Sequence, residues 1–120
     1  MTRFGLLLTS DGFASQSLAS VLLFARTAVQ HNHCIDHIFL YQDAVYCAAD
    51  NIDLPADEPD LSAELASFCQ QLQIPLLFCV TAAEKRGVVS DTLAARAGYT
   101  GAGLAELAMR QSNIDKLVQF

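Results

Sequence analysis

Short apolar runs alternate along the chain with longer segments whose apolar residues recur at helical spacing. The runs Arg3–Thr9, Ile35–Tyr41 and Pro75–Val80 are brief and almost uniformly apolar, which predicts buried β-strands. A further run at Lys116–Phe120 predicts a final strand. Because these strands lack polar alternation, they are typical of a parallel sheet that is covered on both faces.

Helices are predicted in the segments between these strands. From Ser15 to Gln30 the apolar residues return every three or four positions, as on one face of a helix. The acidic stretch Asn51–Asp60 contains two prolines and predicts a loop, and its Pro59 suits the first turn of a second helix. The expected apolar stripe of that second helix consists of Leu61, Leu65, Phe68 and Leu72.

The region after the third strand is more broken. Short helical pieces are predicted near Thr81–Arg86, Asp91–Ala97 and Gly101–Arg110, with Gly87 and Gly98 as helix stops. Strands that alternate with helices predict an α/β fold. We expect one domain over residues 1–120, a three-layer sandwich with a mainly parallel sheet of flavodoxin-like architecture.

Composition agrees with a compact domain and narrows the range of partners. Of the 120 residues, 52% are hydrophobic and 17% are charged. The net charge of −6 argues against direct nucleic-acid binding, because phosphates would be repelled. The run Leu6–Leu8 is too short for a signal peptide or a membrane span, so we expect a cytoplasmic, reducing location and free thiols.

Four cysteines are present, and no two are spaced as a Cys-x-x-Cys pair, so neither a zinc site nor a thioredoxin-like motif is indicated. Sites in open parallel sheets form beyond the carboxyl ends of the strands. Cys79 ends the third strand there and is the obvious nucleophile, although a buried packing cysteine is an equal alternative. Cys34, Cys47 and Cys69 are expected to be packing or incidental residues, with Cys47 the main exception, because it follows the second strand.

The residues after Cys79 favour an activated thiol. Thr81 followed by Glu84 is a capping-box pattern, which predicts that a helix begins at Thr81. Thiols at helix N-termini have pKa values lowered from about 8.5 toward roughly 3.5–7.5. Lys85 and Arg86 add positive charge close by. We therefore expect Cys79 to be catalytic, with these four residues supporting its thiolate.

Other polar groups are weighed against plainer interpretations. Tyr41 and Asp43 follow the second strand and are expected at the edge of the site. His31, His33 and His37 cluster at the opposite edge, where we expect a solvated turn in preference to a metal site.

Two alternative chemistries fit less well. Phosphatase and rhodanese loops place an Arg six positions after the Cys, but here that position is Lys85, which lacks a planar fork. The turn at Asp11–Gly12 resembles a phosphate turn only faintly, and no glycine-rich nucleotide motif is present. A ligand-binding α/β module with its site near Asp11 and Tyr41 is the remaining alternative.

Several segments, in order along the chain, resemble the DsrE/TusD family of sulfur-relay proteins, and its TusD branch fits best. The most specific is Cys79–Val88, which is close to Cys-Val-x-Ala-Ala-x-Arg-Arg-Gly-Val. The others are the opening strand, Phe39–Val45, Gly103–Leu107 and Val118–Phe120.

The resemblance implies a DsrE-like fold and a sulfurtransferase that carries sulfane sulfur as a persulfide on Cys79, with no metal or organic cofactor. It implies assembly with TusB- and TusC-like subunits into a heterohexamer, a TusA-like sulfur donor and a TusE-like acceptor. The sulfur would end in 2-thiouridine at the tRNA wobble position. A DsrE-type role in dissimilatory sulfur oxidation and a non-catalytic structural subunit are the alternatives.

The chain departs from the family pattern at two places. Lys85 stands where the family has the first Arg of a pair. The stretch 96–103 is shorter than the family usually has, which affects the expected partner-facing surface.

Overall fold

The computed structural model describes residues 1–120 and contains a five-stranded sheet in which every neighbouring pair is parallel. The strand order is β4-β3-β2-β1-β5. The strands are β1 (Arg3–Leu8), β2 (Cys34–Leu40), β3 (Leu76–Cys79), β4 (Thr100–Ala102) and β5 (Lys116–Gln119). The prediction of an α/β fold with a parallel sheet is confirmed.

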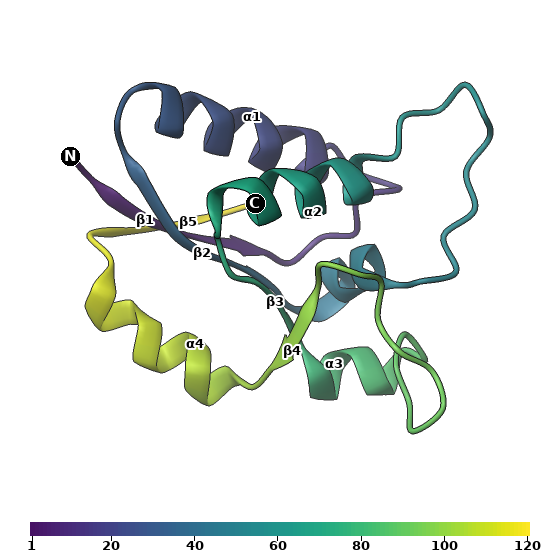
Figure 1. Cartoon of the computed structure of the whole chain (residues 1–120). Coiled ribbons are helices and arrows are strands. Elements are labelled where there is room, and N and C mark those ends of the chain that lie inside the picture. Colours follow the sequence, from purple (N-terminus) through teal and green to yellow (C-terminus); the bar gives the residue numbers. More distant parts are fainter.

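Helices cover both faces of the sheet. Figure 1 shows α1 and α2 together on one face, α4 crossing the other face, and α3 directly below the end of β3. The α-helices are α1 (Ser17–Gln30), α2 (Leu61–Leu72), α3 (Val80–Lys85) and α4 (Leu104–Arg110). Two 3₁₀ segments, η1 (Gln42–Ala48) and η2 (Gln111–Asn113), follow β2 and α4.

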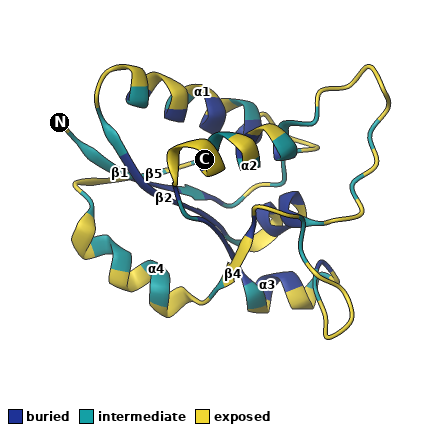
Figure 2. Ribbon diagram, viewed as in Figure 1, coloured by how far each residue is buried: buried dark blue, intermediate teal, exposed yellow.

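The two faces are covered unequally. The main core lies between the sheet and the α1–α2 layer, where Val21 and Leu65 are fully buried. Figure 2 shows buried residues along the central strands and the inward sides of α1 and α2, whereas α4 is only half-buried or exposed. No residue of α4 or β5 is buried. The face of the sheet that α4 crosses is therefore less completely covered by this chain than the face under α1 and α2.

The buried face of α2 differs from the predicted stripe. Its buried residues are Ser62, Leu65 and Cys69, while Leu72 is 44% exposed. A serine can face the core because its hydroxyl donates to the Cys47 carbonyl at 2.5 Å. Leu61 and Phe68 of the predicted stripe still pack against the core as partly buried residues, and the buried face also includes Ser62, which apolar spacing does not reveal.

The start of α2 also differs slightly. Pro59 lies before the helix, and Asp60 is the N-cap, its carboxylate accepting from the Ala63 N–H at 3.1 Å. Asp60 also receives two hydrogen bonds from the Arg96 guanidinium. The N-cap therefore ties α2 to the segment that precedes β4.

The helix predicted at Asp91–Ala97 is wrong. Ser90 and Leu93 exchange backbone hydrogen bonds in a turn, and the Ser90 hydroxyl accepts from the Thr92 N–H. Ala95 forms an isolated antiparallel bridge with Ala49. Serine bonds to nearby backbone compete with a helix, and the bridge then holds the segment extended.

The helix predicted at Gly101–Arg110 begins later, because its first residues belong to β4. Gly101 lets this strand approach β3, since a Cβ atom there would lie 2.7 Å from Val80 Cγ2. Gly98, with φ +94°, lies in the turn before β4 and does not end a helix. Gly87 follows the end of α3 with φ +72°, so its prediction as a helix stop is confirmed.

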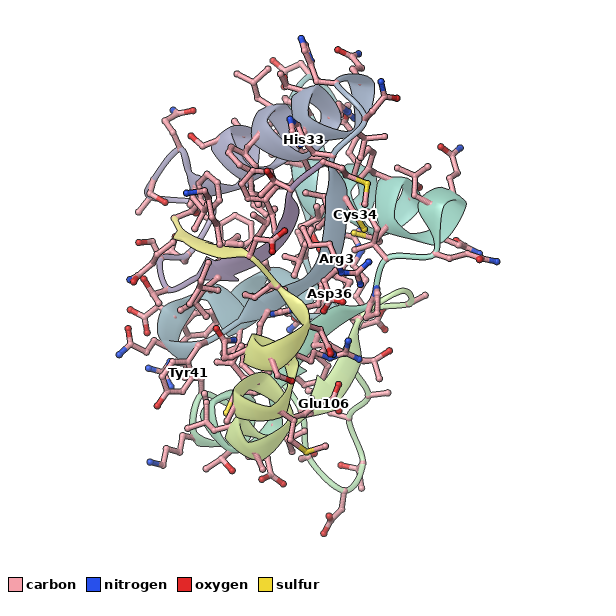
Figure 3. The ribbon with its side chains drawn as sticks, turned by 90° about the vertical axis from the view of Figure 1, so that its left-hand side faces the viewer. Arg3, His33, Cys34, Asp36, Tyr41 and Glu106 are labelled. Atoms are coloured by element: carbon pink, nitrogen blue, oxygen red, sulfur yellow. The ribbon has the colours of Figure 1, made fainter.

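A bulge between β1 and β2 places charged groups under α4. The register shifts between Phe4 and Gly5, so Asp36 is the extra residue of β2. The Asp36 carboxylate accepts from His37 Nδ1 at 2.8 Å and from Arg3 Nη2 at 2.5 Å, and Arg110 Nη1 of α4 lies 3.5 Å away. Figure 3 shows Arg3, Cys34 and Asp36 grouped on the strands, with Glu106 on the helix nearby.

The solvated turn expected around the three histidines is wrong for His37, which is fully buried in β2. His31 is exposed, and His33 is half-buried and accepts from the Thr2 N–H at 3.0 Å. No three His, Cys, Asp or Glu side chains are grouped so that they could hold a metal ion.

Candidate functional site

Cys79 is both the last residue of β3 and the N-cap of α3, so no loop separates strand from helix. The predicted helix start at Thr81 is wrong, because α3 begins at Val80 and has no side-chain cap. The backbone of Cys79 already has the extended N-cap conformation, with φ −71° and ψ 115°, which places Thr81 inside the first turn. The cysteine is therefore closer to the helix end than the capping-box pattern indicates.

The C-terminal end of α3 is closed by backbone hydrogen bonds. The Gly87 N–H donates to the Glu84 carbonyl at 3.2 Å, and the Val88 N–H donates to the Ala83 carbonyl at 2.9 Å. This pair of bonds with a left-handed glycine is a Schellman motif. It ends the helix directly after Lys85 and so fixes where the two basic residues lie relative to Cys79.

A cavity of about 420 Å³ lies at this end of β3. Cys79 contributes to its wall, although the residue is only 3% exposed. The cavity is lined by Tyr41, Gln42, Cys79, Thr81, Ala82, Lys85, Arg86 and Leu104. Segments after β2, β3 and β4 thus meet at the carboxyl edge of the sheet, as open parallel sheets favour.

The predicted site residues are not equivalent in this arrangement. Tyr41, Thr81, Lys85 and Arg86 line the cavity with Cys79. Asp43 and Glu84 do not line it. Asp43 nevertheless reaches the site indirectly, because its carboxylate holds Arg86.

Arg86 is held on two sides by this chain. Its Nε donates to Asp43 Oδ1 at 2.9 Å, and its Nη1 donates to the Ala82 carbonyl at 3.1 Å. The first bond joins η1 to α3, and the second uses a carbonyl of α3 itself. Lys85, by contrast, forms no ion pair with any carboxylate of the chain.

Three residues of the cavity wall were not among the predicted site residues, namely Gln42, Ala82 and Leu104. Gln42 has φ +53°, a left-handed conformation that is uncommon outside glycine and that turns the chain directly after β2. Leu104 comes from the start of α4 and is 47% exposed. The place of Gln42 after a strand could have indicated it, whereas Leu104 depends on β4, which was not predicted.

The other cysteines lie in different surroundings. Burial raises the pKa of Cys47 to about 11 and that of Cys69 to about 12, so both remain protonated near neutral pH. Cys34 is half-buried at the opposite end of the sheet, where it accepts from Arg3 Nη1 at 3.4 Å. Figure 3 shows Cys34 well separated from Tyr41, which marks the cavity end of β2. Cys79 is thus the cysteine of the cavity.

The site is displaced from the place where the strand order reverses. That reversal lies between β1 and β5, which flank each other although they are the first and last strands. The cavity instead lies beyond the ends of β2 and β3 and is closed by Leu104, the second residue after β4. A nucleotide in the crevice of the strand reversal would therefore not reach Cys79.

Comparison with known proteins identifies the family. Residues 2–120 match the sequence model of the DsrE/DsrF-like family. The chain belongs to the DsrE/DsrF-like family. A protein named sulfurtransferase TusD from Enterobacter sp. (strain 638) is 32% identical over 98% of this chain and 99% of its own length. A sulfurtransferase TusD from Erwinia tasmaniensis is 34% identical over the same shares.

Solved structures support the DsrE-like fold. The ychN protein from E. coli has a TM-score of 0.81 at 24% identity, with each chain fully covered. A protein of unknown function from Methanobacterium thermoautotrophicum has a TM-score of 0.65 at 14% identity, again over both full chains. No helix of this family member combines the length and apolarity that crossing a bilayer needs.

Proposed function

We propose that the chain is a sulfurtransferase of a sulfur relay, which accepts a sulfane sulfur on Cys79 as a persulfide and passes it to an acceptor protein. The observation that carries the proposal is a cavity that is lined by Cys79 together with two basic residues, Lys85 and Arg86. The full-length relatives named sulfurtransferase TusD support the same activity.

The proposed transfer needs only thiol–persulfide exchange. The Cys79 thiolate attacks the terminal sulfur of a donor persulfide R–S–S⁻, the donor S–S bond breaks, R–S⁻ leaves, and Cys79–S–S⁻ is formed. An acceptor thiolate R′–S⁻ then attacks the terminal sulfur of Cys79–S–S⁻ and becomes R′–S–S⁻, and the Cys79 thiolate is released. Atoms and electrons balance without a redox partner, and the burial of Cys79 limits contact between the intermediate persulfide and bulk solvent.

The proposed partners are those that the family resemblance of the sequence implies. We place the chain with TusB- and TusC-like subunits in a heterohexamer, between a TusA-like donor and a TusE-like acceptor, with 2-thiouridine of tRNA as the destination. Apolar side chains left exposed along α4 and β5 support a further subunit on that face, namely Leu104, Met109 and Leu117. The TusD name of the relatives favours tRNA thiolation over a role in sulfur oxidation.

Mass spectrometry tests the activity directly. After incubation with a persulfide donor protein, intact mass should rise by the mass of one sulfur or a small multiple of it. Peptide mapping should place the added sulfur on Cys79. The gain should be lost in Cys79→Ser and retained in Cys34→Ser, the control at the half-buried cysteine outside the cavity.

A mass gain that survives in Cys79→Ser would contradict the proposal. A chain that takes up no sulfur at all, alone or with its partner subunits, would instead support a purely structural subunit.

A further inference from the structure

Five of the seven Lys and Arg side chains of this acidic chain form ion pairs with its own carboxylates. Seven Lys and Arg residues face thirteen Asp and Glu residues. Every arginine forms an ion pair with a carboxylate, these being Arg3, Arg26, Arg86, Arg96 and Arg110. Only the two lysines, Lys85 and Lys116, form none, and of these only Lys85 lines a cavity with a cysteine.

The two adjacent basic residues of the cavity therefore have different tasks. The Arg86 charge is largely offset by Asp43, and its guanidinium is fixed by two hydrogen bonds, so it holds η1 against α3. The Lys85 ammonium is exposed, has no ion-pair partner, and is attached to the last residue of α3. Lys85 is therefore the positive charge of the cavity wall that remains available to a ligand in the cavity.

Sulfur transfer gives such a charge a specific use. Persulfides are stronger acids than thiols, so both the donor sulfur and the Cys79 thiolate carry negative charge when they approach each other. Repulsion between the two anions slows the exchange unless a cation lies beside them. In a chain with a net charge of −6, that repulsion is increased by the rest of the molecule.

We infer that Lys85 is the residue that makes the Cys79 cavity selective for anionic reagents, and that Arg86 is a positioning residue without this role. The inference rests on the proposed function in naming a persulfide anion as the natural reagent. The selectivity itself is a property of the cavity and can be measured with reagents that carry no sulfur.

Two alkylating reagents of similar size and different charge separate the effect from general thiol reactivity. Iodoacetate is an anion and iodoacetamide is neutral, and both displace iodide by attack of the thiolate to form a thioether. The rate of each at Cys79 is read by peptide mass spectrometry. The fraction of Cys79 present as thiolate and the accessibility of its sulfur affect both rates alike, so they do not change the ratio of the two rates.

We expect the iodoacetate to iodoacetamide ratio at Cys79 to fall about tenfold in Lys85→Glu. Lys85→Gln should give a smaller fall, and Lys85→Arg should retain the wild-type ratio because it keeps the charge. Lys116→Glu is the matched control, since it makes the same charge change at the other unpaired lysine, on β5. In 1 M salt, the ratio of the wild-type protein should approach that of Lys85→Gln, because the Debye length is then about 3 Å.

An unchanged ratio in Lys85→Glu, or an equal fall in Lys116→Glu, would overturn the inference. So would a wild-type Cys79 that neither reagent reaches, since the cavity would then not admit an anion of this size. If Cys79 takes up no sulfur but the rate ratio depends on Lys85, only the proposed function is rejected. If Cys79 takes up sulfur but the rate ratio does not depend on Lys85, only the inference is rejected.

Discussion

At the scale of single residues, the bulge between β1 and β2 leaves no room beside the buried His37 ring. The imidazole donates from Nδ1 to Asp36, while its Nε2 is buried without a hydrogen-bond partner. Gly5 lies against the ring on the neighbouring strand. A Cβ atom at position 5 would lie 2.7 Å from His37 Cε1 and 2.8 Å from Ile114 Cδ1.

Gly5→Ala should therefore lower the free energy of unfolding by about 1–3 kcal/mol, because ring and isoleucine must shift in a packed region. Urea denaturation measures the change. Gly103→Ala is the control, since its φ is −109° and a Cβ atom there meets nothing within 4 Å. Equal stabilities of the two variants would show that the region under α4 is looser than the contacts indicate.

At the scale of elements, Asp60 joins α2 to the segment before β4. Hydrogen bonds from Arg96 hold the pKa of the Asp60 carboxyl below its ordinary value, against the opposing effect of burial. A lowered folded-state pKa contributes stability that is complete above the unfolded-state value. That contribution is lost as the pH falls through the folded-state value.

Asp60→Asn should keep the helix cap but lose the ion pair, at a cost of about 0.5–1 kcal/mol at pH 7 for a partly exposed pair. The difference from wild type should shrink as the pH is lowered below about 4, the region where unfolded carboxyls gain protons. Chemical denaturation at a series of pH values tests this, with Asp57→Asn in the exposed loop as control. A difference that stays constant with pH would contradict the assignment.

How far the elements could be predicted depends on where their stability comes from. The strands β1, β2 and β3 carry their own signal, since buried parallel strands are continuous apolar runs. The strand β4 is the triplet Thr100–Ala102, which has little strand propensity and exists because it pairs with β3. Once β4 was missed, the start of α4 and the place of Leu104 in the cavity could not be predicted.

The candidate site divides in the same way. Cys79, Tyr41 and Lys85 could be placed from strand ends and local order alone. The left-handed conformation at Gln42 could not be predicted, because glycine and asparagine are the residues that usually indicate such a turn. The Asp43–Arg86 ion pair joins positions 43 residues apart, so it could not be predicted from the spacing of residues within one helix or strand.

At the scale of the whole molecule, α4 connects the two edge strands and packs Leu107 against the core, but it leaves Leu104 and Met109 exposed. Met109 is 73% exposed, whereas Arg110 of the same helix pairs with Asp36 and Glu106. The helix is thus held on its own sheet by the Arg110–Asp36 ion pair and by Leu107, and it presents apolar atoms to solvent at Leu104 and Met109. This is the surface on which we place the proposed partner subunits.

Met109→Glu should reduce co-purification with co-expressed TusB- and TusC-like subunits by roughly tenfold or more, because a charge would be buried in the interface. Native mass spectrometry of the purified complex gives the measurement. Leu23→Glu is the matched control on α1, at a side chain that is 69% exposed on the opposite layer. Loss of the complex in the Leu23 variant alone would place the partners on the α1 side.

The direct junction of β3 with α3 has a consequence for how a loaded chain differs from an empty one. No loop separates β3 from α3, and Cys79 as a whole residue is only 3% exposed, so a partner must enter the cavity to reach its thiol. An added sulfur lengthens the side chain by one S–S bond of about 2 Å. Under the proposed function, the terminal sulfur of the persulfide therefore lies closer to the cavity opening than the free thiol does. An acceptor can then distinguish the sulfur-loaded chain from the unloaded chain without a conformational change.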